Sequence, residues 1–249
     1  MFNFLYRNNP GEGKPLGAKL EEEKPHVKKY PLTAATIPSM ETPVVLGIPW
    51  YSEFDSPVRD ALSLRYWIGR KKDLGWVRGG HSVCLKPYNL NDKYRWWKYY
   101  NQGNEGACVG FALSRAVSMM NVETYDARWL YQEAQLIDEY EETPPEEGTS
   151  VDAGCKILFN VGHKRAVVKS GQWIIQPVSL LKGIAAYRWA TNMDDIHKSL
   201  KNPVADKLGA IPILNSWGLA YPHVVWMPDE TADRVIFQEW GEASVLTDR

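Results

Sequence analysis

Residues 101–120 read NQGNEGACVGFALSRAVSMM, and the character of this stretch changes at Cys108. Before Cys108 the stretch is rich in Gly and Asn, a composition typical of a loop. From Cys108 onward, apolar residues recur with the period of about 3.6 residues that marks a helix with one buried face; they are Val109, Ala112, Leu113, Ala116, Val117 and Met120. The sequence therefore predicts a loop that leads into a helix beginning at Cys108.

A cysteine in the first turn of a helix is a candidate nucleophile. The first backbone N–H groups have no partner within the helix, and the helix dipole favours an anion near them. Both effects lower the pKa of a thiol and favour the reactive thiolate. We therefore expect a lowered pKa for Cys108. The alternative from this residue alone is a small cysteine that only packs the start of the helix.

The segment NQGNEGACVGFA resembles the active-site segment of papain-like cysteine peptidases. This resemblance implies that Cys108 is the nucleophile and that Gln102 donates a hydrogen bond to the oxyanion. EGACVGFA, together with EGTSV at residues 147–151, is most similar to the phage and bacterial branch of the family.

Two other segments extend the resemblance. GGHSV at residues 79–83 resembles the strand that carries the catalytic histidine, here His81, and LNSWG at residues 214–218 resembles the segment of the orienting asparagine, here Asn215. The resemblance implies that Trp217 shields the contact between Asn215 and the histidine. We expect Trp217, Gly79 and Gly80 to border the substrate, because glycines let another backbone approach closely.

Hydrophobic patterns place these segments in an α+β fold. Strand patterns cover residues 43–51, 77–85, 210–214, 224–227 and 243–246, and helix patterns cover residues 126–140, 149–162, 192–201 and 229–240. The resemblance implies a two-lobe arrangement, in which a helical lobe (88–202) packs on an antiparallel sheet or barrel lobe (31–87 plus 203–249). Residues 1–30 are polar and rich in Gly and Pro, and we expect a flexible arm there.

The order of the motifs departs from the family. Papain-like enzymes place Cys before His and His before Asn, whereas this chain has His81, then Cys108, then Asn215. The block at residues 42–85 resembles strands that follow the helices in the sequence of papain-like enzymes, but here it precedes them. Because a catalytic triad depends on geometry and not on chain order, we expect this block to pair with the strand that leads to Asn215.

The composition and the absence of certain motifs limit the partners, the compartment and the cofactors that we expect for this protein. The net charge of −1, from 29 basic and 30 acidic residues, argues against a nucleic-acid partner. Three cysteines in 249 residues argue against a disulfide framework and fit a cytoplasmic protein, of the host cell or associated with a virion. No apolar run reaches the ~18 residues of a membrane span, and the N-terminus lacks a signal-peptide pattern. No metal-binding or phosphate-binding motif is present, so we expect no cofactor or metal.

The sequence thus predicts a cysteine peptidase that hydrolyses peptide bonds of a peptide or protein substrate with Cys108, His81, Asn215 and Gln102. Two alternatives stay open: a catalytically silent binding or virion protein with the same fold, and an acyltransferase or amidase with the same residues. Among the other histidines, His223 is the rival base, His197 is expected on a solvated helix face, and His163 is expected in a turn.

Overall fold

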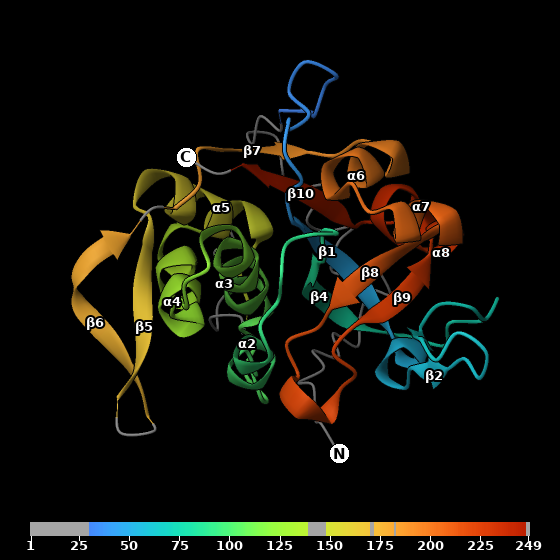
Figure 1. Cartoon of the computed structure of the whole chain (residues 1–249), viewed down its shortest axis with the longest axis horizontal. Helices are drawn as coiled ribbons and strands as arrows, with labels where there is room; N and C mark the ends of the chain where they lie inside the picture. The colour runs from blue at the N-terminus through green and yellow to red at the C-terminus, as the bar shows by residue number, and fades with distance from the viewer. Residues whose placement is uncertain (1–29, 139–147, 170–171, 182, 248–249) are drawn as a thin grey trace, which may run out of the picture.

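The computed structural model describes residues 30–138, 148–169, 172–181 and 183–247 (Figure 1). Of the arm expected at residues 1–30, all but Tyr30 lies outside the described residues. Helices and strands both contribute to the architecture, which is mixed α+β as the sequence predicts.

The α-helices are α2 (Tyr94–Tyr99), α3 (Cys108–Asn121), α4 (Ala127–Ile137), α5 (Val151–Asn160), α6 (Met193–Leu200), α7 (Pro203–Leu208) and α8 (Asp229–Asp233). The shorter helical turns are η1 (Ser52–Asp55), η2 (Gly218–Ala220) and the π-helical η3 (Arg234–Gln238). Several helices begin at the expected residues, because Asp126 and Asn192 cap α4 and α6 with their side-chain oxygens.

The strands are β1 (Val44–Tyr51), β2 (Val58–Arg59), β3 (Tyr66–Trp67), β4 (Val77–Leu85), β5 (His163–Lys169), β6 (Gln172–Leu181), β7 (Ala186–Trp189), β8 (Ala210–Leu214), β9 (Val225–Pro228) and β10 (Glu242–Thr247). Eight of them form one sheet in the order β2-β3-β9-β8-β4-β1-β10-β7, and β5 pairs with β6. All pairs in the large sheet are antiparallel except β3 with β9.

The pairing of β4 confirms that the block at residues 42–85 joins the sheet of the Asn215 strand. On one side β4 pairs along its length with β1, and on the other Cys84 lies opposite Leu214 of β8. β1 is a nearly continuous buried apolar run, VVLGIPWY, and it needs a partner on each edge to satisfy its backbone. It pairs with β4 and with β10, so the first and last strands of the described chain lie side by side in the sheet.

The two faces of the sheet border different cores. Val45 and Cys84 face a core that contains α3, α4 and α5, whereas Val44 and Leu46 face a core that includes Ile196 of α6. In Figure 1, α3, α4 and α5 lie together at one side of the molecule, and α6, α7 and α8 lie at the other. The site residues come from elements at the junction between these two groups.

α3 is buried more completely than its sequence predicts. Its pattern predicts one buried face, yet every residue from Val109 to Met119 is buried. α4, α5, β4 and β1 all pack against it, so it has no face left for solvent. A helix enclosed on all sides can carry a polar side chain only if that side chain has partners, and Arg115 and Ser114 are such residues.

Residues 88–202 contain the helices α2 to α6 and, in addition, three strands that the sequence patterns do not predict. They are β5, β6 and β7, and β7 joins the large sheet beside β10. α6 packs against β1 and β10 instead of joining α3 and α4. The single helix expected at residues 229–240 ends as α8 at Asp233 and continues as the π-helical turn η3.

Candidate active site

α3 begins at Cys108, as predicted, directly after Ala107, which has no side-chain acceptor to cap the first turn. The first turn of α3 lies against the sheet, because α3 packs on β4, the strand that carries His81 and Ser82. The structure describes all three cysteines; Cys84 and Cys155 are buried, and Cys108 is partly exposed. Among the three cysteines, Cys108 is thus the one that is partly exposed, and it stands at the start of a buried helix.

The pKa of Cys108 differs from the expectation. Burial raises the pKa of this thiol above its ordinary value, although the amide hydrogen bonds from Ser82, Val109 and Cys108 itself act to lower it. The prediction of a lowered pKa is therefore wrong for Cys108 at rest, because the protein packed around the first turn of α3 outweighs the effect of the helix start. A thiolate here requires a base that takes the proton.

His81 is held by Asn215 in a defined tautomer. The Nε2 atom of His81 lies 2.8 Å from Oδ1 of Asn215, and the same oxygen accepts a hydrogen bond of 2.7 Å from the backbone N–H of Ser216. Because a backbone N–H can only donate, it identifies Oδ1 as the oxygen of the amide. Neutral His81 must then carry its proton on Nε2, which leaves the basic lone pair on Nδ1.

His81 lies on the strand against which the helix of Cys108 packs, because α3 contacts β4. Burial raises the pKa of Cys108, and the backbone N–H of Ser82, the residue that follows His81 in β4, acts to lower it. The structure places His81 of β4 against Asn215 at the end of β8, and it packs α3, the helix that begins at Cys108, against β4.

Two tryptophans enclose the imidazole. The ring of Trp217 stacks on His81 with the centroids 5.3 Å apart, and the ring of Trp50 meets it edge to face at 4.7 Å. Burial lowers the pKa of His81 to about 4, although the hydrogen bond with Asn215 acts to raise it. His81 is therefore a neutral base at pH 7.

Gln102 closes the loop that precedes α3. Its side-chain Nε2 donates to the carbonyl of Glu105 at 2.9 Å, and its backbone N–H donates to the carbonyl of Ser216 at 2.9 Å. Glu105 is held in turn by Arg128 of α4, at 2.9 Å. The side-chain amide of Gln102 carries a second hydrogen, which is the donor that an oxyanion would need.

The residues expected at the substrate differ in their surroundings. Trp217 is only 6% exposed and lies against His81, so it covers the contact of His81 with Asn215. Gly80 is exposed. Gly79 has a φ of +143°, which favours glycine, and no atom would lie within 4 Å of a Cβ at this position. Gly79 therefore leaves open space beside β4, whereas a Cβ at Gly80 would lie 3.6 Å from the ring of Trp240.

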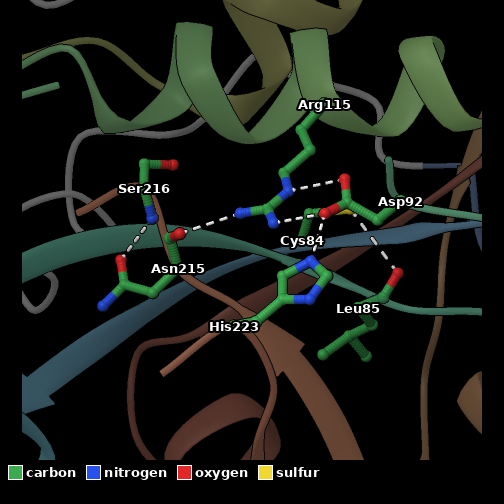
Figure 2. Close-up of polar contacts among 7 residues, drawn as sticks. All are labelled: Cys84, Leu85, Asp92, Arg115, Asn215, Ser216 and His223. Carbon is green, nitrogen blue, oxygen red and sulfur yellow. Dashed lines mark hydrogen bonds and ion pairs between the residues drawn. The ribbon is translucent and has the colours of Figure 1, made fainter. Parts of the chain in front are cut away.

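A buried ion pair, which the sequence reasoning missed, lies behind Asn215 (Figure 2). Arg115 of α3 donates to both carboxylate oxygens of Asp92, at 2.9 and 2.5 Å, and to the backbone carbonyl of Asn215 at 2.9 Å. Asp92 also contacts Nε2 of His223 at 2.5 Å. An arginine within an otherwise apolar helix was the available signal, because a buried charge needs a partner. His223 therefore belongs to this pair.

Two further histidines differ from their expected places. His163 lies buried in β5 instead of in a turn; its Nδ1 accepts the backbone N–H of Lys164 at 2.9 Å, so its Nε2 is the donor to Ser114 Oγ at 2.7 Å. This tautomer cannot take a proton from Ser114, which excludes a serine nucleophile there. His197 is not on a solvated face, because it lies between Asp206 (2.8 Å) and Asp229 (3.0 Å).

Among the described residues, no group of three or more His, Cys, Asp and Glu side chains is arranged to hold a metal ion. Within the same part of the chain, none of the helices combines the length and apolarity needed to cross a bilayer. No protein-family model matches this chain, and no curated protein matches it either. Any functional assignment therefore depends on the residues and contacts of the site itself.

Proposed function

We propose that the chain is a papain-like cysteine peptidase that hydrolyses peptide bonds. The observation that carries this proposal is the 2.8 Å contact between His81 Nε2 and Asn215 Oδ1. Cys108 is partly exposed and begins the buried helix that packs against the strand of His81. Three segments chosen from the sequence for their separate chemical roles supply these three side chains.

The tautomer of His81 gives each group a role. Nδ1 of His81 takes the proton of the Cys108 thiol while the sulfur forms a bond with the carbonyl carbon of the substrate. The resulting oxyanion accepts hydrogen bonds from the second hydrogen of Gln102 Nε2 and from the backbone N–H of Cys108. His81 then returns the proton to the leaving amine. In the second half of the reaction His81 takes a proton from water, the water oxygen attacks the acyl-enzyme carbonyl, and His81 gives the proton back to the Cys108 sulfur as the acid product leaves.

The resting protonation states support a coupled proton transfer. Burial raises the pKa of Cys108 and lowers that of His81 to about 4, so both groups are neutral at pH 7 before substrate binds. We infer that the proton moves as the sulfur attacks, in place of a preformed thiolate and imidazolium pair. The amide donors around the sulfur would stabilise the charge that develops during this step.

The chain order belongs to the same proposal. β1 and β4 precede the helices in sequence, yet they lie between β8 and β10, which follow the helices. We infer a permuted papain-like arrangement of two lobes, in which the block that carries His81 has moved ahead of Cys108. The antiparallel pairs β1 with β4 and β4 with β8 are the contacts that support this inference.

One observation favours a catalytically silent relative as the second candidate. A raised thiol pKa describes a cysteine of low intrinsic reactivity, as a binding protein that kept the fold would have. The two candidates differ in whether His81 activates Cys108 when a substrate is bound.

Labelling and hydrolysis separate the two candidates. Wild-type chain, Cys108→Ala and the matched control Cys155→Ala are incubated with a quenched peptide library and with a peptide that carries a thiol-directed electrophile. We expect wild type and Cys155→Ala to hydrolyse peptides and to be labelled at Cys108, and Cys108→Ala to do neither. Folded wild type that shows neither reaction would contradict the peptidase and favour the silent relative.

A further inference from the structure

Arg115 connects the helix of the nucleophile to the strand of the orienting asparagine. Its side chain is fully buried, and each of its three nitrogens has a partner: Nε and Nη2 donate to Asp92, and Nη1 donates to the carbonyl of Asn215. Figure 2 shows the guanidinium lying between these two partners. Arginine suits this place because its planar fork presents donors in several directions at once.

The bond from Arg115 holds Asn215 from one side, and the loop of Gln102 holds the next residue from the other. The carbonyl of Asn215 accepts from Arg115, and the carbonyl of Ser216 accepts from the backbone N–H of Gln102. The N–H between these two carbonyls, that of Ser216, donates to Oδ1 of Asn215. The peptide group that orients the Asn215 side chain is therefore anchored on both sides.

Asp92 makes the buried arginine tolerable. A buried guanidinium without a counter-charge is strongly unfavourable, and the carboxylate of Asp92 supplies that charge with two of its hydrogen bonds. Burial acts to raise the pKa of Asp92, but Arg115 and His223 outweigh it and hold the pKa below the ordinary value. The ring of Trp97 stacks on His223, with the centroids 4.8 Å apart, and covers the outer side of the pair.

We propose that Arg115, together with Asp92, is a positioning element for the reaction: it sets the backbone of Asn215 so that the Asn215 side chain keeps His81 in its Nε2–H tautomer. This role rests on the proposed peptidase function, and it concerns residues that touch neither the substrate nor the reacting atoms. The guanidinium of Arg115, buried in α3, would thus contribute to the reaction as well as to the stability of the fold.

Arg115→Lys is the principal test. A lysine keeps the charge beside Asp92, but its three N–H donors lie on one nitrogen and cannot reproduce the fork with which Arg115 reaches Asp92 and the carbonyl of Asn215 together. We expect kcat to fall by about 10-fold to 100-fold, because small displacements far from the chemistry have effects of this size. We expect KM to change by no more than ~2-fold, since substrate contacts are preserved.

A double-mutant cycle with Asn215→Ala identifies the route of the effect. If Arg115 acts through the Asn215 side chain, Arg115→Lys lowers kcat in wild type and causes no further loss in Asn215→Ala. Ser114→Ala is the matched control: it removes a buried hydrogen bond from the neighbouring residue of α3, and we expect kcat per folded molecule to stay at the wild-type value. Independent losses from Arg115→Lys and Asn215→Ala would overturn the proposal.

A spectroscopic measurement separates this proposal from the peptidase itself. The ¹⁵N signals of the His81 ring report which nitrogen carries the proton, with or without activity. We expect the Nε2–H form in wild type and Ser114→Ala, and a mixture with the Nδ1–H form in Asn215→Ala and Arg115→Lys. The double variant Arg115→Met/Asp92→Leu replaces the ion pair with apolar side chains of similar volume, a change that proteins often tolerate. It provides a second test and should show the same mixture of tautomers.

The outcomes are distinct. Wild-type ring signals in Arg115→Lys and in the double variant would overturn the positioning role, whatever the activity. Wild type that hydrolyses no peptide counts against the peptidase, and the ring signals then still decide whether Arg115 sets the tautomer of His81.

Discussion

Oδ1 of Asn215 lies 2.8 Å from Nε2 of His81, although 134 positions separate the two residues in the chain. This contact forms because β4 pairs with β8, which brings the His81 strand alongside the strand that ends before Asn215. It sets the tautomer of His81 and orients the ring. The chemistry of the site therefore depends on a sheet that joins distant parts of the chain.

Asn215→Ala should move the acid limb of the pH–rate profile to lower pH. His81 must be neutral to act as the base, so we expect kcat/KM to fall as the pH drops through about 4, the pKa to which burial lowers His81. The Asn215 hydrogen bond acts to raise this pKa, and its removal lowers the pKa further. Ser216→Ala keeps the backbone N–H and should retain the wild-type limb. A limb that moves to higher pH in Asn215→Ala would contradict this assignment.

Cys108 should be alkylated well before the other two thiols. It is partly exposed, whereas Cys84 and Cys155 are buried and burial raises the pKa of both far above the ordinary value. The measurement is a time course with iodoacetamide at pH 7, read by mass spectrometry of peptides. We also expect His81→Ala to slow the labelling of Cys108, because the imidazole is the proposed acceptor of its proton. Equal rates for the three thiols would indicate a cysteine that only packs the start of α3.

Gln102→Ala should reduce kcat by about 10²-fold to 10³-fold, the usual effect of losing one oxyanion donor. We expect KM to change little, because the donor acts mainly in the transition state. Gln102 also braces its own loop through the carbonyl of Glu105, so a control for loop order is required. Glu105→Gln weakens the pair with Arg128 and keeps that carbonyl, and it should retain most of the activity. Equal losses in both variants would assign Gln102 to loop structure alone.

His197 should stabilise the fold more at low pH than at high pH. Its hydrogen bond with Asp229, together with Asp206, raises its pKa above the ordinary value of 6.5, although burial opposes this. The stabilisation is complete below pH 6.5 and is lost as the pH rises through the higher folded pKa. We expect His197→Gln to lower the free energy of unfolding at pH 5.5 by on the order of 1 kcal/mol, and by less at pH 9. Urea unfolding of both proteins at the two pH values measures the difference, and a larger loss at pH 9 would contradict it.

Gly110→Ala should destabilise the junction of α3 and α4. A Cβ at this position would meet the carbonyl of Ala127 and would lie 2.8 Å from Cβ of Tyr131, so the two helices would have to move apart. We expect a loss of about 1–3 kcal/mol, the usual cost of overpacking. Gly148→Ala, where a Cβ would have open space, is the control, and its unfolding curve should match wild type. A stable Gly110→Ala protein would show that the helices can separate without cost.

Local sequence patterns are sufficient to locate the elements around the site. The apolar period after Cys108 located α3, the buried run of β1 and the alternation of β4 located two central strands, and Asp126 located the start of α4. These predictions succeed because periodicity and capping depend on neighbours within a few positions in the chain. The motifs also identify His81, Cys108 and Asn215 as candidate site residues.

The electrostatics of the site and the outer strands of the sheet depend on contacts between elements that are distant in the chain. The raised pKa of Cys108 comes from packing around α3, and the partners of Arg115 and His197 come from other elements, so no local pattern contains them. β7 joins the sheet because β10 offers it an edge. Desolvation and pairing between distant charges depend on which elements pack together, whereas a sequence pattern reports only which side of one element faces the core.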